Sequence, residues 1–596
     1  MGDSPKDKLL RPGGGVGGGG GGRSSFSFGG FGSVGEDVLE SVLRRLPAAT
    51  FASAACVSRS WHGVCKRILS RPKLASALSL NPCAQIALQE VVDKVLSEPI
   101  CPHFAIVNVG NNVNMTDALQ YIGQKLGART PLVISADSGI IGVDALTNQV
   151  KEVEGGIDDV GSSYNNEDSD NAERGIILTV GFVPGLKVDV VPLLHLEEAN
   201  EDRLMVDKFI TDMMEYSVAV SGCSTPVGVI MFGDGAAEIK SAAEKLDYAM
   251  PLEAAIVGDE KGTFQYRSVD NSRYISAIGQ QQYTISAVAL VFAKDRHKCP
   301  GLGDIKFHVA VSDGLSAIGL RHRAASVKVG DCCTLLTARR EGQEEILDGE
   351  GILNDIRDEL ENRVEYPDVY IGVTKRRIYE VGAEKAKLMS FLSFHGVMGG
   401  VEYLRVEGSG IESGDSFQFY YSDPAAALVS CHKVSACLRS LNLGSDSDCS
   451  DKMGNVVVSA GKPWVFGGFI FSSFGRGESF FNDVNVDSSP FVENFPGVPV
   501  AGIFCGGEIG RCSPSLSMQD SEEETPVHRV CHVYSTVYLI MSYTPALQVP
   551  LLHLDPLIFS LWIGCLCIST SPDMLIRKKE NLGSCLYGGC FDIPMI

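Results

Sequence analysis

Apolar residues near the start of the sequence recur at the spacing of one helical face. Within residues 35–47, four apolar side chains occupy positions i, i+3, i+4 and i+7, namely Leu39, Val42, Leu43 and Leu46. Arg44 and Arg45 lie off this stripe, and a Leu-Pro pair closes the run. A helix with one apolar side must bury that side against its own core, a membrane or another protein.

The helical spacing continues after Pro47. Apolar residues follow at intervals of three and four, namely Ala54, Val57, Trp61, Cys65, Ile68 and Leu69. The pattern predicts a short all-helical module over residues 34–80. Residues 1–33 are rich in glycine, which predicts a disordered arm ahead of this module.

From Phe104 onward the pattern changes to short apolar runs typical of strands, separated by amphipathic helical stretches. Runs such as FAIVNVG and TPLVISAD alternate with MTDALQYIGQKLG, which predicts a mixed α/β (α+β) domain over residues 104–300. A second α/β domain is expected over residues 305–546. Residues 152–174 are acidic and lack apolar periodicity, so we predict a solvated loop there.

Residues 547–596 differ in composition from the rest and form an atypical tail. The stretch 549–568 is about long enough to span a bilayer, but two prolines, His553 and Asp555 interrupt it. A charge inside a bilayer is costly, and the uninterrupted apolar part, residues 557–568, is too short to cross. We therefore expect no membrane partner.

Charge and cysteine usage narrow the classes of partner. The sequence has 51 lysines and arginines against 73 aspartates and glutamates, a net charge of −22, which argues against a nucleic-acid binder. Its 18 cysteines include no CxxC pair, so no zinc-ribbon or RING signature is present. The sequence opens without an apolar signal region, and scattered thiols are typical of reduced proteins of the cytoplasm or nucleus.

Motifs of the common enzyme classes are missing. The sequence contains no HExxH, no GxSxG and no Walker A motif. Cys223, Cys431 and Cys505 are candidate nucleophiles, but a free cysteine is more often a small buried apolar residue. We expect a non-catalytic protein without a cofactor or a metal.

The helical module resembles the F-box, whose pattern is an apolar helix ending in Leu-Pro, followed by a Val-Cys/Ser-Lys/Arg-x-Trp stretch. The matching positions are Val38, Leu39, Val42, Leu43, Leu46, Pro47, Cys56, Val57, Ser58, Arg59 and Trp61. The usual opening Leu-Pro pair is replaced here by Val34-Gly35. The alternative is an ordinary helical cap with Trp61 in its core.

The F-box resemblance implies docking on a Skp-type adaptor, and through it on a cullin scaffold. Apolar side chains would fill a complementary groove on the adaptor. The expected adaptor-binding residues are Leu39, Val42, Leu43, Leu46, Pro47, Val57 and Trp61. Some of these must instead hold the core of the module itself, and the sequence does not separate the two roles.

Two later segments, GGFIFSSFGRGESFF at 467–481 and FPGVPVAGIFCGGEIG at 495–510, resemble the C-terminal half of the FIST domain. The matching positions are Gly467, Arg476, Gly477, Phe480, Phe481, Pro499, Gly502, Gly506, Glu508 and Gly510. Residues 104–300 resemble the N-terminal half, with weaker motifs. No leucine-rich period of 20–29 residues is present.

Arg476 and Glu508 are charged residues inside otherwise apolar runs. They could form a buried ion pair that holds two strands together. They could also bind a small ligand, with Arg476 taking a carboxylate and Glu508 an amine. In that case Gly477, Gly502 and Gly506 would allow close approach of the backbone. The FIST resemblance implies sensing of amino-acid-like ligands, and both interpretations stay open.

Together the two resemblances imply the substrate-recognition subunit of an SCF-type cullin-RING ubiquitin ligase. The F-box would hold the adaptor, and the FIST region would hold a protein target for ubiquitin-dependent proteasomal degradation. The alternative is a small-ligand sensor in signal transduction, in which the F-box serves as an anchor.

Overall fold

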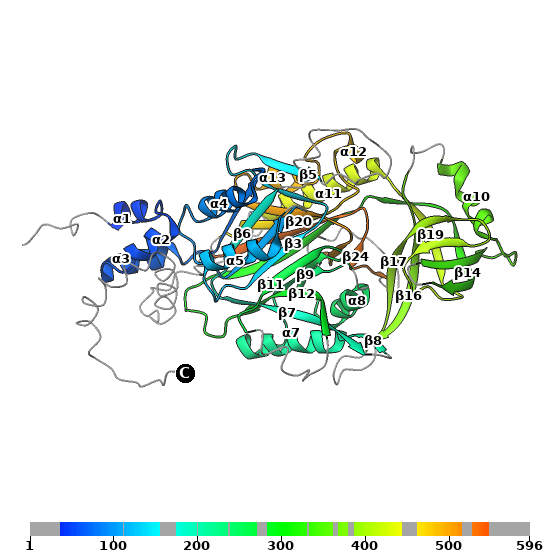
Figure 1. The fold of residues 1–596 in the computed structure, drawn as a ribbon, viewed down its shortest axis with the longest axis horizontal. Coiled ribbons are helices and arrows are strands. Elements are labelled where there is room, and N and C mark those ends of the chain that lie inside the picture. Colours follow the sequence, from blue (N-terminus) through cyan, green and yellow to red (C-terminus); the bar gives the residue numbers. More distant parts are fainter. Residues whose placement is uncertain are drawn as a thin grey trace, which may run out of the picture.

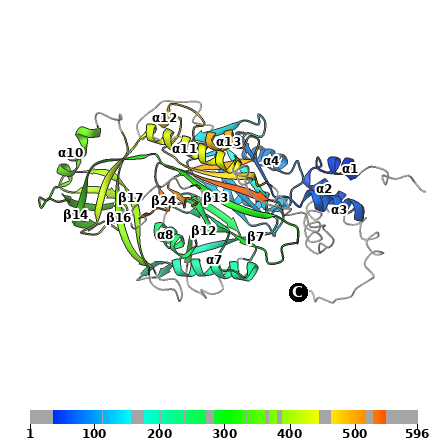
Figure 2. The same ribbon diagram turned by 180° about the vertical axis from the view of Figure 1, so that it is seen from behind.

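The computed structural model describes most of the chain between residues 36 and 546 (Figure 1). The described ranges are 36–110, 113–154, 175–198, 201–235, 239–270, 283–330, 333–360, 367–379, 387–443, 462–514, 516 and 527–546. Along its longest axis the molecule has three parts, a helical module, a body of sheets and helices, and a β-barrel, and both views show the body between the other two (Figures 1 and 2).

The helical module contains α1 (Glu36–Leu43), α2 (Ala48–Ala54) and α3 (Arg59–Ile68). Ser58 caps α3, because its hydroxyl accepts a hydrogen bond of 3.2 Å from the backbone N–H of Trp61. The module attaches to the body where the backbone N–H of Ala48 donates to the carbonyl of Leu96 at 2.9 Å. These observations confirm a helical module followed by a mixed α/β region. The module ends earlier than the predicted residue 80, because β1 (Lys73–Ser79) lies in the first sheet of the body.

The body consists of three repeats of a β-α-β-α-β unit, each closed by an antiparallel strand. The first repeat comprises β1 (Lys73–Ser79), α4 (Ala84–Val95), β2 (Phe104–Val109), α5 (Met115–Leu126), β3 (Leu132–Ala136) and β6 (Ile176–Phe182). The second comprises β7 (Leu186–Glu198), α7 (Val206–Ser221), β9 (Gly228–Gly233), α8 (Lys240–Ala249), β10 (Ala255–Asp259) and β12 (Tyr283–Lys294). The third comprises β13 (Asp304–Ser312), α11 (Pro424–Leu443), β20 (Trp464–Ser473), α12 (Glu478–Phe481), α13 (Ser489–Asn494), β21 (Val500–Cys505) and β25 (Thr536–Thr544).

Each repeat builds one sheet, and each sheet has the same strand order. The orders are β1-β6-β2-β3-β11, β7-β12-β9-β10-β22 and β13-β25-β20-β21-β4, with β5 (Val150–Glu154), β8 (Glu201–Leu204) and β24 (Cys531–His532) at the edges. The pairs β2/β3, β9/β10 and β20/β21 are parallel. The last strand of each order is contributed by another repeat, namely β11 (Thr263–Arg267), β22 (Glu508–Gly510) and β4 (Gly139–Val143). The repeats are therefore interlocked by exchanged strands.

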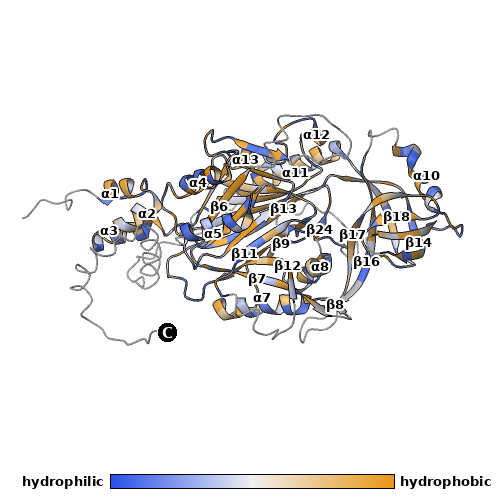
Figure 3. Cartoon of the chain, in the orientation of Figure 1, coloured by the Kyte–Doolittle hydropathy of each residue, from blue (hydrophilic) through white to orange (hydrophobic). Residues whose placement is uncertain are grey.

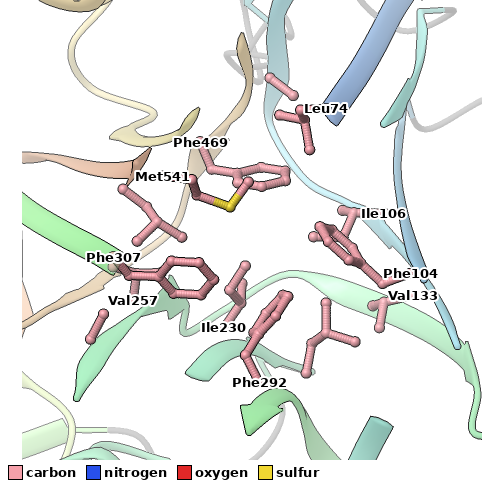
Figure 4. Packing of buried hydrophobic residues seen from close by; sticks show 14 of the residues in the cluster. Leu74, Phe104, Ile106, Val133, Ile230, Val257, Phe292, Phe307, Phe469 and Met541 are labelled. Carbon is pink, nitrogen blue, oxygen red and sulfur yellow. The ribbon is translucent and has the colours of Figure 1, made fainter. Parts of the chain in front are cut away.

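The three sheets share one apolar core. Phe104 of the first repeat packs edge-to-face on Phe292 of the second, with ring centroids 5.0 Å apart, and Phe292 packs in the same way on Phe307 of the third at 5.0 Å (Figure 4). Helices cover the outer faces in pairs, with α4 and α5 on the first sheet, α7 and α8 on the second, and α11 and α13 on the third. Figure 3 accordingly shows mostly apolar strands in the body and polar residues on α4 and on α10 (Gly349–Leu360).

The β-barrel is an insertion between β13 and α11 of the third repeat. Its strands are β14 (Leu315–Val329), β15 (Cys333–Arg340), β16 (Val369–Tyr379), β17 (Lys387–Gly400), β18 (Leu404–Glu407) and β19 (Ser416–Ser422). The order β16-β19-β14-β15-β18-β17 closes through antiparallel pairing of β16 with β17, and β23 (Val527–His528) adds to β17 in parallel. Helix α10 (Gly349–Leu360) inserts Ile352 and Ile356 into the barrel core.

Two further predicted boundaries differ from the structure. The division into domains 104–300 and 305–546 does not separate two units in space, because β4 and β5 lie in the third sheet while β22 and β24 lie in the second. Strand β5 includes residues 152–154, so the predicted acidic loop starts later than expected. Residues 155–174, the arm 1–33 and the tail 547–596 lie outside the described residues. Within the part of the chain that is described, no helix has the length and apolarity needed to cross a membrane.

Candidate functional site

The helices of the module divide their apolar residues between an inner and an outer side. Leu43 is fully buried in a small core, and Leu39, Leu46 and Trp61 are partly buried against it. The other members of this core are Phe51, Ala54, Ala55, Val64 and Cys65. Leu43 therefore stabilises the module itself, and our assignment of this residue to the adaptor surface is wrong.

Four apolar residues of the module face outward, and we call them the exposed apolar set: Val38, Val42, Pro47 and Val57. The valines are 57%, 53% and 63% exposed, and Pro47 is also exposed. Val38 and Val42 are one turn apart, so they lie on the same face of α1. An α-helix with an exposed apolar stripe is a form of surface that inserts into an apolar groove of a partner.

The guanidinium of Arg476 is fully buried and paired, but not with Glu508. Its Nη2 lies 2.7 Å from Oδ1 of Asp487, and its Nε lies 3.1 Å from Oδ2 of the same carboxylate. Its Nη1 donates to the carbonyl of Tyr534 at 3.0 Å. Asp487 is also fully buried, and its Oδ2 accepts a further hydrogen bond of 2.7 Å from Ser472.

This arrangement is a structural ion pair with its hydrogen bonds satisfied inside the protein. All three guanidinium nitrogens make hydrogen bonds within the protein and the side chain is fully buried, so Arg476 is not placed to meet a ligand carboxylate. Of the two interpretations of Arg476, a buried ion pair fits the geometry, with Asp487 as its partner.

Two of the predicted site glycines allow close packing of neighbouring segments. A Cβ on Gly477 would lie 1.8 Å from the carboxylate of Glu154, which accepts a hydrogen bond of 2.6 Å from the backbone N–H of Glu478. A Cβ on Gly502 would lie 2.5 Å from the carbonyl oxygen of Ile470 on the neighbouring parallel strand. Both positions require glycine because backbone or a carboxylate occupies the space of a side chain.

Glu152 lies beside the ion pair, and its environment raises its pKa. Its Oε1 accepts a hydrogen bond of 2.6 Å from the backbone N–H of Ser488. Burial raises the pKa of the Glu152 carboxyl from 4.5 to about 7, and the nearby negative charge of Asp487 contributes to this rise. The folded protein thus binds this proton more tightly than the unfolded chain.

Glu152→Gln is expected to stabilise the protein at pH 8 by about 2–3 kcal/mol, and to change it by less than about 1 kcal/mol at pH 5. A carboxyl whose pKa is raised by folding contributes stability that is fully present below pH 4.5 and lost as pH rises through 7. Denaturant unfolding at both pH values measures the difference, with Glu215→Gln on the exposed side of α7 as the control. An equal effect of Glu152→Gln at both pH values would contradict the assigned pKa.

Comparison with known proteins identifies the module. Residues 35–72 match the family model of the F-box domain. The chain is also 43% identical over 522 residues to an F-box/LRR-repeat protein of Arabidopsis thaliana, a match that covers 86% of this chain and 93% of the relative. The chain belongs to this family of F-box proteins. The F-box resemblance drawn from residues 38–61 is confirmed, and an F-box domain implies binding to a Skp1-type adaptor and thereby to a cullin scaffold.

The name of the relative includes a leucine-rich repeat, which the described part of this F-box protein does not show. Its described strands lie in three interlocked mixed sheets and an antiparallel barrel. A leucine-rich solenoid instead stacks one short strand per repeat into a single sheet.

Gly506 and Glu508 lie at a second buried polar centre, which we call the sheet junction: Asp137, Asp259, Cys505, Gly506 and Glu508. The backbone N–H of Gly506 donates to Oδ2 of Asp137 at 3.3 Å. Asp259 and Glu508 are fully buried and stand directly opposite each other in the antiparallel pair of β10 and β22. The sequence-predicted site therefore splits between this centre and the Arg476 ion pair.

The sheet junction concentrates acidic groups away from water. Burial raises the pKa of Asp259, and the negative charge of Asp137 raises it further. Burial likewise raises the pKa values of the Glu508 carboxyl and of the Cys505 thiol. Cys505 is fully buried, and a buried thiol with a raised pKa is a poor nucleophile, so its environment does not favour Cys505 as a catalytic residue.

Sequence reasoning missed Asp137 and Asp259, although a signal was present. Both follow apolar strand runs directly, in LVISAD and AIVGD, and Cys505 ends the comparable run AGIFC. Polar residues at the carboxyl ends of parallel strands commonly form sites in α/β proteins.

Proposed function

We propose that this F-box protein is the substrate-recognition subunit of an SCF-type cullin-RING ubiquitin ligase. The observation that supports it most directly is the exposed apolar set on an F-box module that contacts the body at one end of the molecule (Figure 1). The remaining predicted adaptor-binding residues, Leu39, Leu46 and Trp61, would support this surface from the module core. The protein would act in the cytoplasm or the nucleus.

In this proposal the body and the barrel hold the protein target. We assign the body to the FIST domain on the motif residues between Gly467 and Gly510. The chain would form no covalent bond with its target. It would raise the effective concentration of a target lysine near a ubiquitin-loaded conjugating enzyme, which is how tethering accelerates a bimolecular step. Proteasomal degradation of the target would follow.

The test compares the tagged full-length chain with a variant that cannot bind the adaptor, both in cells treated with a proteasome inhibitor. Affinity purification with mass spectrometry should recover the adaptor and the cullin with the wild type only. A true target should be recovered with both forms, and in cells without the inhibitor its half-life should lengthen when the variant replaces the wild type.

A different result would favour a different function. If the adaptor is recovered but no protein changes its half-life, the proposal of a substrate receptor fails. The polar sheet junction then favours the alternative, a small-ligand sensor whose F-box serves as an anchor.

A further inference from the structure

The sheet junction is the place where all three repeats of the body meet. At the end of its third strand, each repeat crosses from its own sheet into another: β3 leads into β4, β10 into β11, and β21 into β22. Asp137 directly follows β3, Asp259 ends β10, and Cys505 ends β21. Each repeat thus contributes one side chain to the sheet junction. These three residues are more than a hundred positions apart in the sequence.

The three side chains present metal-ligating atoms to one another. One carboxylate oxygen of Asp137, one of Asp259 and the Sγ of Cys505 all lie within 4.8 Å of each other. Asp259 and Cys505 are fully buried, whereas Asp137 is partly exposed.

Two carboxylate oxygens of the sheet junction lack a hydrogen-bond donor. Oδ2 of Asp259 is buried and has no hydrogen-bond partner, and the same is true of Oε1 of Glu508 on the opposite strand. Among the described lysines and arginines, none forms an ion pair with Asp137, Asp259 or Glu508. Buried carboxylates are costly unless a proton or a cation compensates them, so the site as built can hold either a shared proton or a bound cation.

We propose that Asp137, Asp259 and Cys505 form a binding site for Zn²⁺. The donor set of one sulfur and two oxygens selects zinc over magnesium or calcium, which take oxygen ligands and avoid thiolate. Zinc bonds of about 2.0–2.3 Å place tetrahedral ligands roughly 3.3–3.5 Å apart, which small side-chain movements reach from the present spacing. A water would complete the coordination, with Glu508 as a buried acceptor for its hydrogen bond.

Such a site would join the three repeats through one ion. Each ligand belongs to a different sheet crossing, so zinc would tie together the three points at which strands are exchanged. This role is independent of the proposed binding of the adaptor, because the junction is in the body and the exposed apolar set is in the helical module.

Zinc titration of the full-length chain tests the proposal. The protein is stripped with a chelator under reducing conditions and titrated with ZnCl₂ against a chromophoric competitor. Asp259→Asn and Cys505→Ser should each lower the number of bound ions by one per chain. We expect the zinc affinity of this site to fall by more than about 100-fold, because mutating even a residue that only hydrogen-bonds to a metal ligand lowers affinity by about 10- to 100-fold. Cys223→Ser, which removes an exposed thiol elsewhere, should leave binding unchanged.

Two further readouts separate lost binding from lost folding. Asn has the shape of Asp, so zinc-free Asp259→Asn should melt no lower than the zinc-free wild type. Zinc at about 100 times its Kd should raise the wild-type midpoint by about 2–3 °C and that of the variant not at all. Co²⁺ in place of zinc should give a thiolate-to-metal absorption band that Cys505→Ser abolishes.

The proposal is overturned if the wild type takes up no zinc, or if Asp259→Asn and Cys505→Ser keep the wild-type number of ions. Zinc held by other cysteines of the chain would give the second result. A cobalt band that survives Cys505→Ser would likewise overturn it.

Discussion

Replacing Arg476 with Met is expected to lower the free energy of unfolding by about 3–5 kcal/mol. The change removes the bidentate partner of Asp487 and leaves a fully buried carboxylate uncompensated. It also withdraws a donor from the carbonyl of Tyr534. The loss should appear as a large drop in the unfolding midpoint without any ligand present.

A second variant shows whether this loss comes from the unpaired charge. Adding Asp487→Leu to Arg476→Met removes both charges, and should recover much of the stability because an apolar pair no longer requires compensation. Arg340 provides a matched control, since it pairs with both oxygens of Asp355 at 2.8 and 2.6 Å but is partly exposed.

Arg340→Met is therefore expected to cost about 1 kcal/mol or less. Denaturant or thermal unfolding of the full chain measures all of these variants. Equal, small losses for Arg476→Met and Arg340→Met would contradict a structural role of the buried pair, and would reopen Arg476 as part of a ligand site.

The second large effect is expected at the F-box. Combining Val42→Asp with Pro47→Ala should weaken adaptor binding by at least about 100-fold. Truncation of interface anchors often costs roughly 2–4 kcal/mol each, and a carboxylate placed against an apolar groove adds the cost of its desolvation. Val42 is exposed, so the change should spare the fold of the module.

Two control variants are chosen by burial, one at an exposed valine away from the module and one at a buried leucine inside it. Val218→Asp, at a similarly exposed valine of α7, should leave adaptor binding unchanged. Leu43→Ala should act differently, because Leu43 is fully buried and its truncation should cost about 2–5 kcal/mol of module stability. Pull-down with the adaptor measures binding, and limited proteolysis reports separately on the module and on the body. Unchanged binding of a folded Val42→Asp, Pro47→Ala protein would contradict an adaptor surface at the exposed apolar set.

The sequence by itself determined the local elements and the F-box. Helical periodicity within residues 35–69 is a local pattern, so it predicted a one-sided helical module before any contact was known. The same holds for the strands of the body, whose apolar runs are short and bounded by turn residues. The Leu-Pro corner and the segment ending at Trp61 then identified the family.

Burial and pairing were decided only by the tertiary structure. Leu43 and Val42 are neighbours in the same stripe, yet one is fully buried and the other 53% exposed, because α2 and α3 cover only part of the face of α1. Arg476 pairs with Asp487 rather than with Glu508. Asp487 lies in the connection between α12 and α13, which follow β20 directly in the chain. Spacing in the sequence contains no information on which of several carboxylates faces a given guanidinium.

The threefold organisation was also invisible in the sequence. The repeats share strand order, and the barrel of residues 315–422 interrupts the third. Asp137, Asp259 and Cys505 therefore looked unrelated, because only the exchange of strands between sheets brings the ends of β3, β10 and β21 together. Local patterns determine elements one at a time, whereas a centre built from three sheet crossings exists only once the sheets have packed.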